Sequence, residues 1–311
     1  MPELPEVTTT VNGLNKVLKN LVIKDVWSDY HVNTANKRTD NIKNRKYFEK
    51  FRREISGEKF LNAERRGKNV LIHLSSGKTI LIHMKMTGHL LYGKYRKISN
   101  FQFLISKQKN ETWVPLEKGL LQDSFNKFIH FVLTLSNGKH LAFSDMRKFA
   151  KVILFETEKR DDLIDLAGLG PEPLTDLTLE ILEKQLKKKP NGKIKSILMD
   201  QSIVAGIGNI YSDEILWEAD IHPERKVKDI SKIEIKKIFK ATKSILNKSI
   251  KMGGDSMSDY RNIYGEKGNF QNAHKVYRKT REKCLKKGCV GVIQRKIIGG
   301  RSTHFCSIHQ K

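Results

Sequence analysis

Apolar residues recur every three or four positions near the start of the chain, namely Val7, Val11, Leu14 and Leu18. This spacing predicts an amphipathic helix with one buried face. Pro5 and Glu6 suit its first turn, because Pro needs no N–H there and a carboxylate favours the positive end of a helix. The helix would therefore hold the start of the chain against a core, although chain termini are usually frayed.

From residue 21 to residue 155 the pattern changes to short apolar or alternating runs, which predict strands. The clearest runs are Asn69–Leu74, Thr79–Met84, Ile129–Leu135, Leu141–Ser144 and Ala150–Phe155. The pair Asn137-Gly138 is a strong hairpin signal. We expect a β-sandwich or flattened barrel with a helix at its start. The stretch from Leu91 to Asn126 is poorly patterned, and it is either an elaborated loop or further strands.

The apolar spacing becomes helical after a Gly- and Pro-containing linker. The predicted helices are Leu177–Lys188, Lys193–Met199, Asn209–Glu218 and Lys232–Met252. The turn Ala205–Asn209 opens the third helix, and its N–H groups suit a phosphate, although such turns are more often structural corners. The segment Gly253–Gln271 has no clear period and predicts a mobile loop that can order over a ligand.

Three cysteines and a histidine form the sharpest spacing in the chain. Cys284 and Cys289 are separated by four residues, sixteen residues follow, and then come Cys306 and His309. Two close pairs across a short ribbon are typical of tetrahedral Zn²⁺, and free thiols are the alternative. An odd number of cysteines at one end of the chain does not suggest a disulfide framework. His304 is a nearby competitor for the position of the fourth ligand.

Between the cysteine pairs the sequence predicts a β-hairpin. Gln294–Ile298 and Thr303–Phe305 would be its strands, with Gly299-Gly300-Arg301 at the tip. Arg301 would then be held on a rigid turn, where it could bind a phosphate, and a solvated turn residue is the alternative.

Taken together, the pattern predicts an α+β protein. We expect an N-terminal β-sandwich domain with its helix at 1–156, a linker at 157–175, a helical domain with a long loop at 176–270, and a zinc finger at 271–311. A chain of 311 residues, 38% of them hydrophobic, is long enough for two such cores.

Charge narrows the choice of partner. The 59 Lys and Arg residues exceed the 34 Asp and Glu residues and give a formal net charge of +25. Such an excess favours a polyanion, usually nucleic acid, over a merely solvated basic surface. The N-terminus shows no leader, and no apolar run approaches the ~18–20 residues that span a bilayer, so we expect a cytoplasmic protein.

The first residues also carry candidate chemistry. Removal of Met1 would leave Pro2 with a free secondary amine. An α-amino group titrates near ~7.7–8.0, so part of it is a neutral nucleophile at physiological pH, able to form an iminium with a sugar C1. The carboxylates of Glu3 and Glu6 beside it could move protons. An ordinary start followed by a turn and a helix is the plainer alternative.

Eight motifs occur in one order along nearly the whole chain. They are Pro2-Glu3-Leu4-Pro5-Glu6-Val7, Arg65-Arg66-Gly67-Lys68, Met84-Lys85-Met86-Thr87-Gly88, Asp145-Met146-Arg147-Lys148-Phe149, Leu198-Met199-Asp200-Gln201, Ala205–Tyr211, Ile221–Arg225 and the Cys/His hairpin. This set resembles the bacterial formamidopyrimidine-DNA glycosylase and endonuclease VIII family of base-excision repair enzymes. The resemblance implies a monomeric two-domain clamp on damaged double-stranded DNA, with a helix–two-turn–helix domain and one structural zinc ion.

The resemblance also implies a mechanism. Pro2 would attack C1′ of a flipped nucleotide, the damaged base would leave, and β- and δ-elimination would follow from the Schiff base. Glu3 would handle the proton, Glu6 would support the base or the open sugar, and Lys68 would hold a phosphate near the lesion. A zinc-containing DNA-binding protein without catalysis is the rival class, and it leaves the residues at the start of the chain unexplained.

Further residues match DNA-binding positions of the family. Met86, Arg147 and Phe149 match residues that fill the space left by the flipped nucleotide, with core packing as the alternative for Met86 and Phe149. Lys148 stands where a second Arg is common, and it is assigned to DNA binding as well. The residues that match phosphate binders are Lys195, Asn209 and Arg301.

The chain departs from the family pattern at the metal site and in loop length. The family usually has four Cys in two C-x2-C pairs, whereas here the first spacing is longer and His309 takes the last place. The loop Gly253–Gln271 is long, which in this family favours oxidised purines such as 8-oxoguanine and formamidopyrimidines. Oxidised pyrimidines are the alternative.

Overall fold

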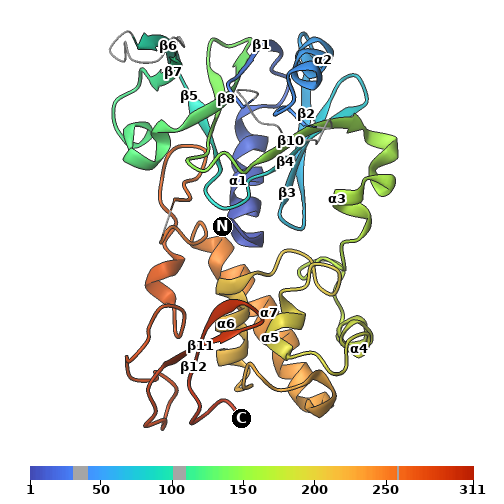
Figure 1. The fold of residues 1–311 in the computed structure, drawn as a ribbon, viewed down its shortest axis with the longest axis vertical. Helices are drawn as coiled ribbons and strands as arrows, with labels where there is room; N and C mark the ends of the chain where they lie inside the picture. The colour runs from blue at the N-terminus through green and yellow to red at the C-terminus, as the bar shows by residue number, and fades with distance from the viewer. Residues whose placement is uncertain (31–40, 101–109, 258) are drawn as a thin grey trace. The chain divides into compact units, whose positions relative to one another are not determined.

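The computed structural model describes residues 1–30, 41–100, 110–257 and 259–311 (Figure 1). These residues form two compact units. The first unit contains residues 1–2, 6–161 and 255–268, and the second contains residues 3–5, 162–254 and 269–311. The four-part division expected from the sequence stays a prediction, and the segment 255–268 is grouped here with the first unit.

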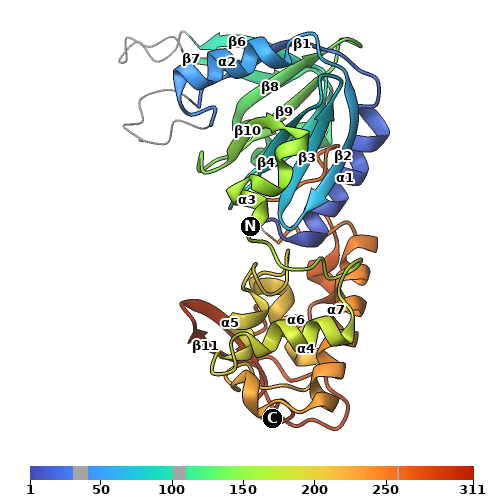
Figure 2. The ribbon, with the colours of Figure 1, turned by 90° about the vertical axis from the view of Figure 1, so that its right-hand side faces the viewer.

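The first unit is a sandwich of two antiparallel four-stranded sheets, as the sequence predicted (Figure 2). One sheet has the order β1 (Ile23–Ser28), β8 (Ile129–Leu135), β9 (His140–Ser144), β5 (His89–Gly93). The other has the order β10 (Lys151–Glu156), β4 (Lys78–His83), β3 (Asn69–Leu74), β2 (Phe60–Arg66). The predicted strand runs therefore match β3, β4, β8, β9 and β10 to within a residue or two.

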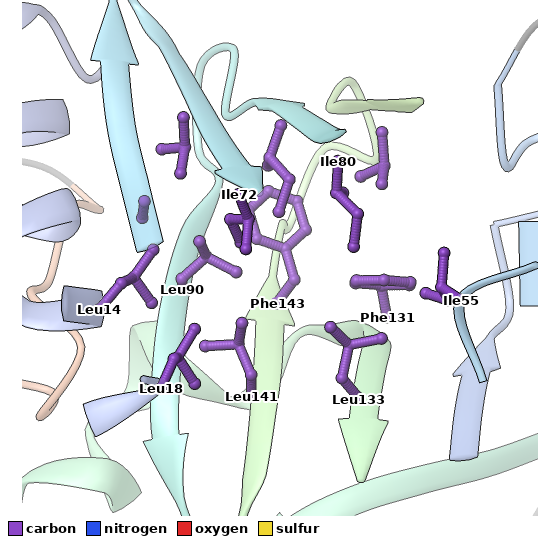
Figure 3. Close-up of a cluster of buried hydrophobic side chains, with 14 of the residues drawn as sticks. Leu14, Leu18, Ile55, Ile72, Ile80, Leu90, Phe131, Leu133, Leu141 and Phe143 are labelled. Atoms are coloured by element: carbon purple, nitrogen blue, oxygen red, sulfur yellow. The ribbon is translucent and has the colours of Figure 1, made fainter. Parts of the chain in front are cut away.

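Apolar side chains from both sheets meet in one core (Figure 3). Ile72 and Ile80 come from one sheet, Phe131 and Phe143 come from the other, and all four are at most 1% exposed. Helix α1 (Leu4–Val17) adds the face that the sequence predicted, including Leu14. Each such side chain contributes about 1.5–3 kcal/mol when fully buried, so this core is the main source of stability of the unit.

Helix α2 (Arg45–Ile55) was not predicted within the stretch 21–155, which is otherwise mainly β as expected. Its apolar residues Phe48, Phe51 and Ile55 recur at helical spacing and are buried in the same core. The side chain of Asn44 caps the helix by accepting a hydrogen bond from the N–H of Tyr47. The helical spacing and the Asn cap are both present in the sequence, but the many charged residues between the apolar positions make the helix hard to recognise.

The poorly patterned stretch from 91 to 126 contains both loop and strand. After the end of β5, a hairpin of β6 (Tyr95–Asn100) and β7 (Asn110–Pro115) leads to two short 3-10 turns, Leu120–Gln122 and Ser124–Lys127. Residues 101–109 lie outside the described part of the chain.

The second unit is helical and ends in a β-hairpin (Figure 1). Its elements are α3 (Ile164–Ala167), α4 (Leu179–Lys187), α5 (Ile194–Leu198), α6 (Asn209–Glu218), α7 (Lys232–Lys251), β11 (Gln294–Ile298) and β12 (Arg301–Phe305). The four predicted helices correspond to α4 to α7, and the predicted hairpin corresponds to β11 and β12. In the described ranges, no helix is both long enough and apolar enough to cross a membrane.

Candidate active site and metal centre

The carboxylate of Glu3 is bound by the N-terminal turn of α6. The N–H of Gly208 donates to Oε2 at 2.7 Å, and the N–H of Ile210 donates to Oε1 at 3.0 Å. Glu3 is only 2% exposed, so these donors replace water around its charge. A helix N-terminus favours an anion because its N–H groups lack partners within the helix. The N–H groups that the sequence suggested for a phosphate therefore hold a carboxylate of the chain itself.

Two glycines make this close approach possible. A Cβ at Gly208 would lie 2.5 and 2.7 Å from the two carboxylate oxygens of Glu3. Gly206 has a φ of +87°, and a Cβ there would lie 2.8 Å from the Cβ of Leu4. The carbonyl of Gly206 also accepts a hydrogen bond from the N–H of Leu4 at 3.0 Å. The Gly-rich turn thus fixes both the backbone and the acidic side chain at residues 3 and 4.

Glu6 is held in a different way, by a segment that returns to the first unit near the end of the chain. We call residues 255–268 the returning loop. The N–H of Asp255 donates to Oε1 of Glu6 at 2.7 Å, and the hydroxyl of Tyr260 donates to the carbonyl of Glu6 at 2.9 Å. Glu6 is fully buried. Pro2 is buried as well and lies directly between the exposed Met1 and the buried Glu3.

Lys68 lies on the turn between β2 and β3, where its side chain is 7% exposed. The nearby imidazole of His83 has its pKa lowered to about 3 by burial and by the charges of Lys85 and Lys68. His83 is therefore neutral at physiological pH, and its Nδ1 accepts a hydrogen bond from the N–H of Lys85 at 3.0 Å. The neutral imidazole of His83, with a donor N–H on its other nitrogen and the ammonium groups of Lys68 and Lys85 nearby, suits an anion. In the sequence, only its position at the end of a predicted strand singled out His83.

Met86, Arg147 and Phe149 are exposed on two turns of the first unit. Met86 is 38% exposed and Phe149 is 48% exposed, so neither of them is a core residue. The guanidinium of Arg147 lies over the ring of Phe149, 4.5 Å from its centroid. Large apolar side chains left in water in this way are typical of a binding surface.

A buried carboxylate joins the two turns. Asp145 is fully buried; its Oδ1 accepts from the hydroxyl of Thr87 at 2.6 Å, and its Oδ2 accepts from the N–H of Ala150 at 2.8 Å. The N–H of Arg147 in turn donates to Oγ1 of Thr87 at 3.2 Å. These bonds fix the backbone beneath the exposed side chains. Asp145 was quoted as part of a sequence motif, but its structural role was not foreseen.

Lys148, the fourth residue expected on this surface, is exposed and has a φ of +53°. Its ammonium donates to Oδ2 of Asp29 at 3.1 Å, and its N–H donates to the carbonyl of Asp145 at 3.0 Å. Its charge is thus partly balanced within the protein.

The structure brings Asn209 and the tip of the hairpin together in the second unit. The amide of Asn209 donates to the carbonyl of Ser302 at 3.0 Å, and Arg301 precedes Ser302 in the exposed start of β12. A Cβ at Gly299, on the same tip, would meet the side chain of Ser196. The two predicted phosphate binders therefore lie on one fixed surface.

Lys195 does not share this surface. Its ammonium is fully buried, forms an ion pair with Asp213 and donates to the carbonyl of Asn209 at 3.1 Å. The expectation that Lys195 contacts a phosphate is therefore not supported by its position. Asp213 also accepts from the N–H of His304 at 3.0 Å, so the buried pair connects α5, α6 and β12. A motif match gives the residue type at a position and not its burial.

The four predicted metal ligands converge on one point. The ligand atoms of Cys284, Cys289, Cys306 and His309 all lie within 4.8 Å of one another. Sγ of Cys284 is 3.3 Å from Nδ1 of His309, and Sγ of Cys289 is 3.6 Å from Sγ of Cys306. Three thiolates and an imidazole can hold a metal ion at this point, and the donor set suits Zn²⁺.

The surroundings of His309 suit a metal ligand. Its Nε2 lies 3.3 Å from the carbonyl of Trp217, which fixes a proton on Nε2 and turns Nδ1 toward the thiols. His304, the competitor in the sequence, is instead 3.1 Å from Oδ2 of Asp213 through its Nδ1. Of the two histidines, His309 is the one whose ring nitrogen lies with the three thiols.

Two family models match the chain. The model described as formamidopyrimidine-DNA glycosylase N-terminal domain matches residues 1–152, and the model described as formamidopyrimidine-DNA glycosylase H2TH domain matches residues 169–261.

Relatives of known name match over the full length. A formamidopyrimidine-DNA glycosylase of Desulforamulus reducens is 36% identical and aligns with 100% of this chain and 99% of its own. The enzyme of the same name from Halalkalibacterium halodurans is 35% identical, with 100% of both chains covered.

Solved structures of proteins with related names are also similar to this chain. The Fpg protein of Lactococcus lactis in complex with DNA containing an abasic site has a TM-score of 0.80 and 29% identity, and 99% of both chains is covered. The protein MutM in complex with DNA containing carbocyclic 8-oxo-G has a TM-score of 0.79 and 30% identity, with 100% of both chains covered.

Proposed function

Because the chain belongs to the formamidopyrimidine-DNA glycosylase family, we propose that it releases oxidised purines from duplex DNA and then cleaves the strand at the abasic site. The observation that carries the proposal is the carboxylate of Glu3, the residue that follows Pro2 in the chain, held by the N–H groups of Gly208 and Ile210. An amine next to a fixed, buried carboxylate is the arrangement that glycosylase and lyase chemistry on a sugar requires.

The proposed reaction begins with removal of Met1, which frees the Pro2 nitrogen. That nitrogen bonds to C1′ of the damaged nucleotide, the bond from C1′ to the base breaks, and the base leaves with a proton. The ring opens to an iminium between Pro2 and C1′. A base then removes a proton from C2′, and the 3′ phosphate leaves in β-elimination. A second elimination releases the 5′ phosphate, and water hydrolyses the iminium.

Glu3 is the proposed proton carrier in these steps, because each of them moves a proton at the sugar. Its two backbone donors fix both oxygens, so the group needs no reorganisation when the reaction starts. We assign Glu6 the support of the base or the open sugar, and we assign Lys68 the phosphate next to the lesion. The neutral His83 beside Lys68 is a further candidate for that phosphate.

The exposed surface of Met86, Arg147 and Phe149 is proposed to fill the space left by the flipped nucleotide. Apolar side chains of this kind keep a kinked duplex open, and the guanidinium over the Phe149 ring could face the unpaired base. Asn209 and Arg301 would bind phosphates on the second unit, with one Zn²⁺ at the four-residue cluster holding the hairpin. We propose that the protein acts as a monomer at the DNA in the cytoplasm.

The choice of oxidised purines is supported by two observations. The segment 253–271, which contains the returning loop, is long. The similar solved structures include MutM with DNA that carries carbocyclic 8-oxo-G. Oxidised pyrimidines remain the substrate to test next to them.

Borohydride trapping tests the proposal directly. Metal-loaded protein without Met1 would be mixed with duplexes that carry 8-oxoguanine opposite cytosine, thymine glycol or an abasic site, beside a Pro2→Gly variant. We expect a covalent adduct on the 8-oxoguanine and abasic duplexes that is lost or much reduced in the variant. An adduct on the thymine glycol duplex without one on 8-oxoguanine would overturn the purine assignment. The absence of an adduct on all three duplexes would overturn the proposal that the protein is a glycosylase and lyase.

A further inference from the structure

The returning loop is attached to the first unit at a second place, away from Glu6. This place is the loop seat, which we define as residues 120–126, between β7 and β8. It contains the first 3-10 turn of that connection and most of the second. The loop seat belongs to the poorly patterned stretch 91–126, to which the proposed chemistry gives no task.

Arg261 connects the returning loop to the loop seat. Its side chain is only 1% exposed, and its Nη2 donates to both carboxylate oxygens of Asp123, at 3.2 and 3.1 Å. Its Nη1 donates to the carbonyl of Tyr260 at 2.8 Å, and the guanidinium lies over the ring of Phe125, 4.9 Å from the centroid. A buried guanidinium costs several kcal/mol unless it is paired, so the loop can lie here only with the loop seat in place.

Asp123 is held by its own turn as well as by Arg261. Its Oδ1 accepts a hydrogen bond from the N–H of Phe125 at 2.9 Å, which caps the second 3-10 turn. Burial tends to raise the pKa of Asp123, but the bonds from Phe125 and Arg261 outweigh it and hold the pKa below its usual value. The carboxylate is therefore charged and oriented at neutral pH.

The backbone of the returning loop also contacts the loop seat and the neighbouring strand β5 closely. Gly265 has a φ of +84°, and a Cβ there would lie 2.7 Å from the carbonyl oxygen of Leu120. The carbonyl of Ile263 accepts from the N–H of Tyr92 at 2.6 Å. Asn126, 1% exposed, donates to the carbonyl of Leu120 at 2.9 Å and is held by Nε2 of His89 at 2.8 Å. The contact is thus built from fixed groups on both sides.

The two attachments meet at neighbouring residues. Tyr260 donates its hydroxyl to the carbonyl of Glu6, and its own carbonyl accepts from Arg261. The two attachments of the loop, at Glu6 and at the loop seat, are therefore made by adjacent residues, Tyr260 and Arg261.

From this geometry we infer that Asp123 and Arg261 are positioning residues for base excision: their ion pair fixes the returning loop on the loop seat and so sets how the loop meets the damaged base. The inference rests on the proposed function and adds to it a specificity element, Asp123, that lies outside the returning loop. An abasic site carries no nucleobase, so strand cleavage there does not require the loop to meet one. The pair should therefore matter for release of the base and much less for cleavage at an abasic site.

The test compares these two activities in single turnover with full-length, metal-loaded protein. Arg261→Met keeps roughly the volume of the side chain without the charge. Because removal of one partner of a buried ion pair is destabilising whereas removal of both charges is often neutral, the double variant Arg261→Met/Asp123→Asn is measured as well. Asp123→Asn removes the charge from the other side. Asp25→Asn is the matched control, because Asp25 pairs with Arg52 on the surface of the same unit, with 53% and 47% of the two side chains exposed. The substrates are 8-oxoguanine, thymine glycol and abasic duplexes.

We expect both variants to lose roughly tenfold in the rate of base release, since small displacements of positioning groups are costly, and to keep abasic cleavage within about twofold. The double variant should be no slower than either single variant, because the two residues act as one unit. Hydrogen exchange of residues 259–265 should increase in Arg261→Met and not in the control.

Equal losses in both activities would overturn the inference, because they would show a general loss of structure. Unchanged base release in both variants would overturn it as well. A wild-type protein that cleaves the abasic duplex but releases neither base would contradict the assigned substrates. A wild-type protein inactive on every duplex would overturn the proposed function, and the inference with it.

Discussion

The two ends of the chain are positioned by different means. At the start, Glu3 and Glu6 are held by backbone N–H groups of Gly208, Ile210 and Asp255, which come from distant parts of the sequence. At the other end, the residues that converge are candidate metal ligands, the three cysteines and His309. The first arrangement is complete within the protein, whereas the second needs an ion.

This difference indicates which amino-acid substitutions each end of the chain can tolerate. Backbone donors persist through most side-chain changes, so the N-terminal turn is vulnerable mainly where space is lacking. A metal site fails when a single ligand is removed, because three ligands rarely hold an ion as tightly as four. The same chain therefore has one end that is sensitive to shape and one that is sensitive to metal supply.

The largest effect should come from Gly208→Ala. The added Cβ would lie 2.5 Å from Oε1 of Glu3, so the carboxylate must move or the turn must open. Displacement of a catalytic group by about 1 Å costs roughly 100-fold, and we expect at least that loss in single-turnover base release. Gly168→Ala is the control, since nothing lies within 4 Å of a Cβ there. Normal activity in Gly208→Ala would show that Glu3 is not held as described.

The metal end should respond to His309→Ala. We expect the purified variant to lose most of its bound metal, measured by elemental analysis, and to bind a lesion duplex at least about tenfold more weakly. His304→Gln, which changes the histidine beside Asp213, should keep the metal. Metal retained in His309→Ala but lost in His304→Gln would reverse the assignment.

A moderate effect is expected from Arg301→Ala on the hairpin tip. The loss of one phosphate contact should weaken binding to damaged and undamaged duplexes alike and reduce the slope of log affinity against log salt by about 1. Equilibrium binding at several salt concentrations measures both. A loss confined to the damaged duplex would instead give Arg301 a role in lesion recognition.

A separate effect concerns stability in acid. Burial lowers the pKa of His89 to about 4, although its bond to Asn126 opposes the shift. Unfolded His titrates near ~6.5, so the unfolded state binds more protons between these values and stability falls as pH is lowered from 6.5 to 4. The slope is at most about 1.4 kcal/mol per pH unit. His89→Gln should reduce this slope. The slope is measured as the pH dependence of the unfolding free energy obtained from hydrogen exchange of the β9 amides, and the variant should keep its metal. An unchanged slope would exclude His89 as its source.

Much of this fold could be predicted because local signals agreed with the global structure. The α6 helix was predicted from residue 209 to residue 218 because a Gly-rich turn precedes it, and the sandwich strands were predicted from short apolar runs and an Asn-Gly hairpin. The convergence of Cys284, Cys289, Cys306 and His309 was predicted because their spacing is typical of a metal site. In contrast, α2 was missed because charged residues hide its apolar face.

The remaining features depend on contacts between residues far apart in sequence. Lys195 matched a phosphate binder by type, but its burial against Asp213 follows from how α5 packs on α6. The partners of Glu3 lie 205 and 207 residues away, and Asp123 is 138 residues from Arg261. No periodicity or local propensity carries such information, so these pairs became visible only in the folded chain.

The close approach of Gly208 to Glu3 has a consequence at the level of the gene. Every L-amino acid except glycine carries a Cβ, and at residue 208 that atom would lie within 2.7 Å of both oxygens of a buried carboxylate. All four glycine codons share their first two bases. Codon 208 can therefore change silently only at its third base, and we expect every missense change there to act as a loss-of-function allele.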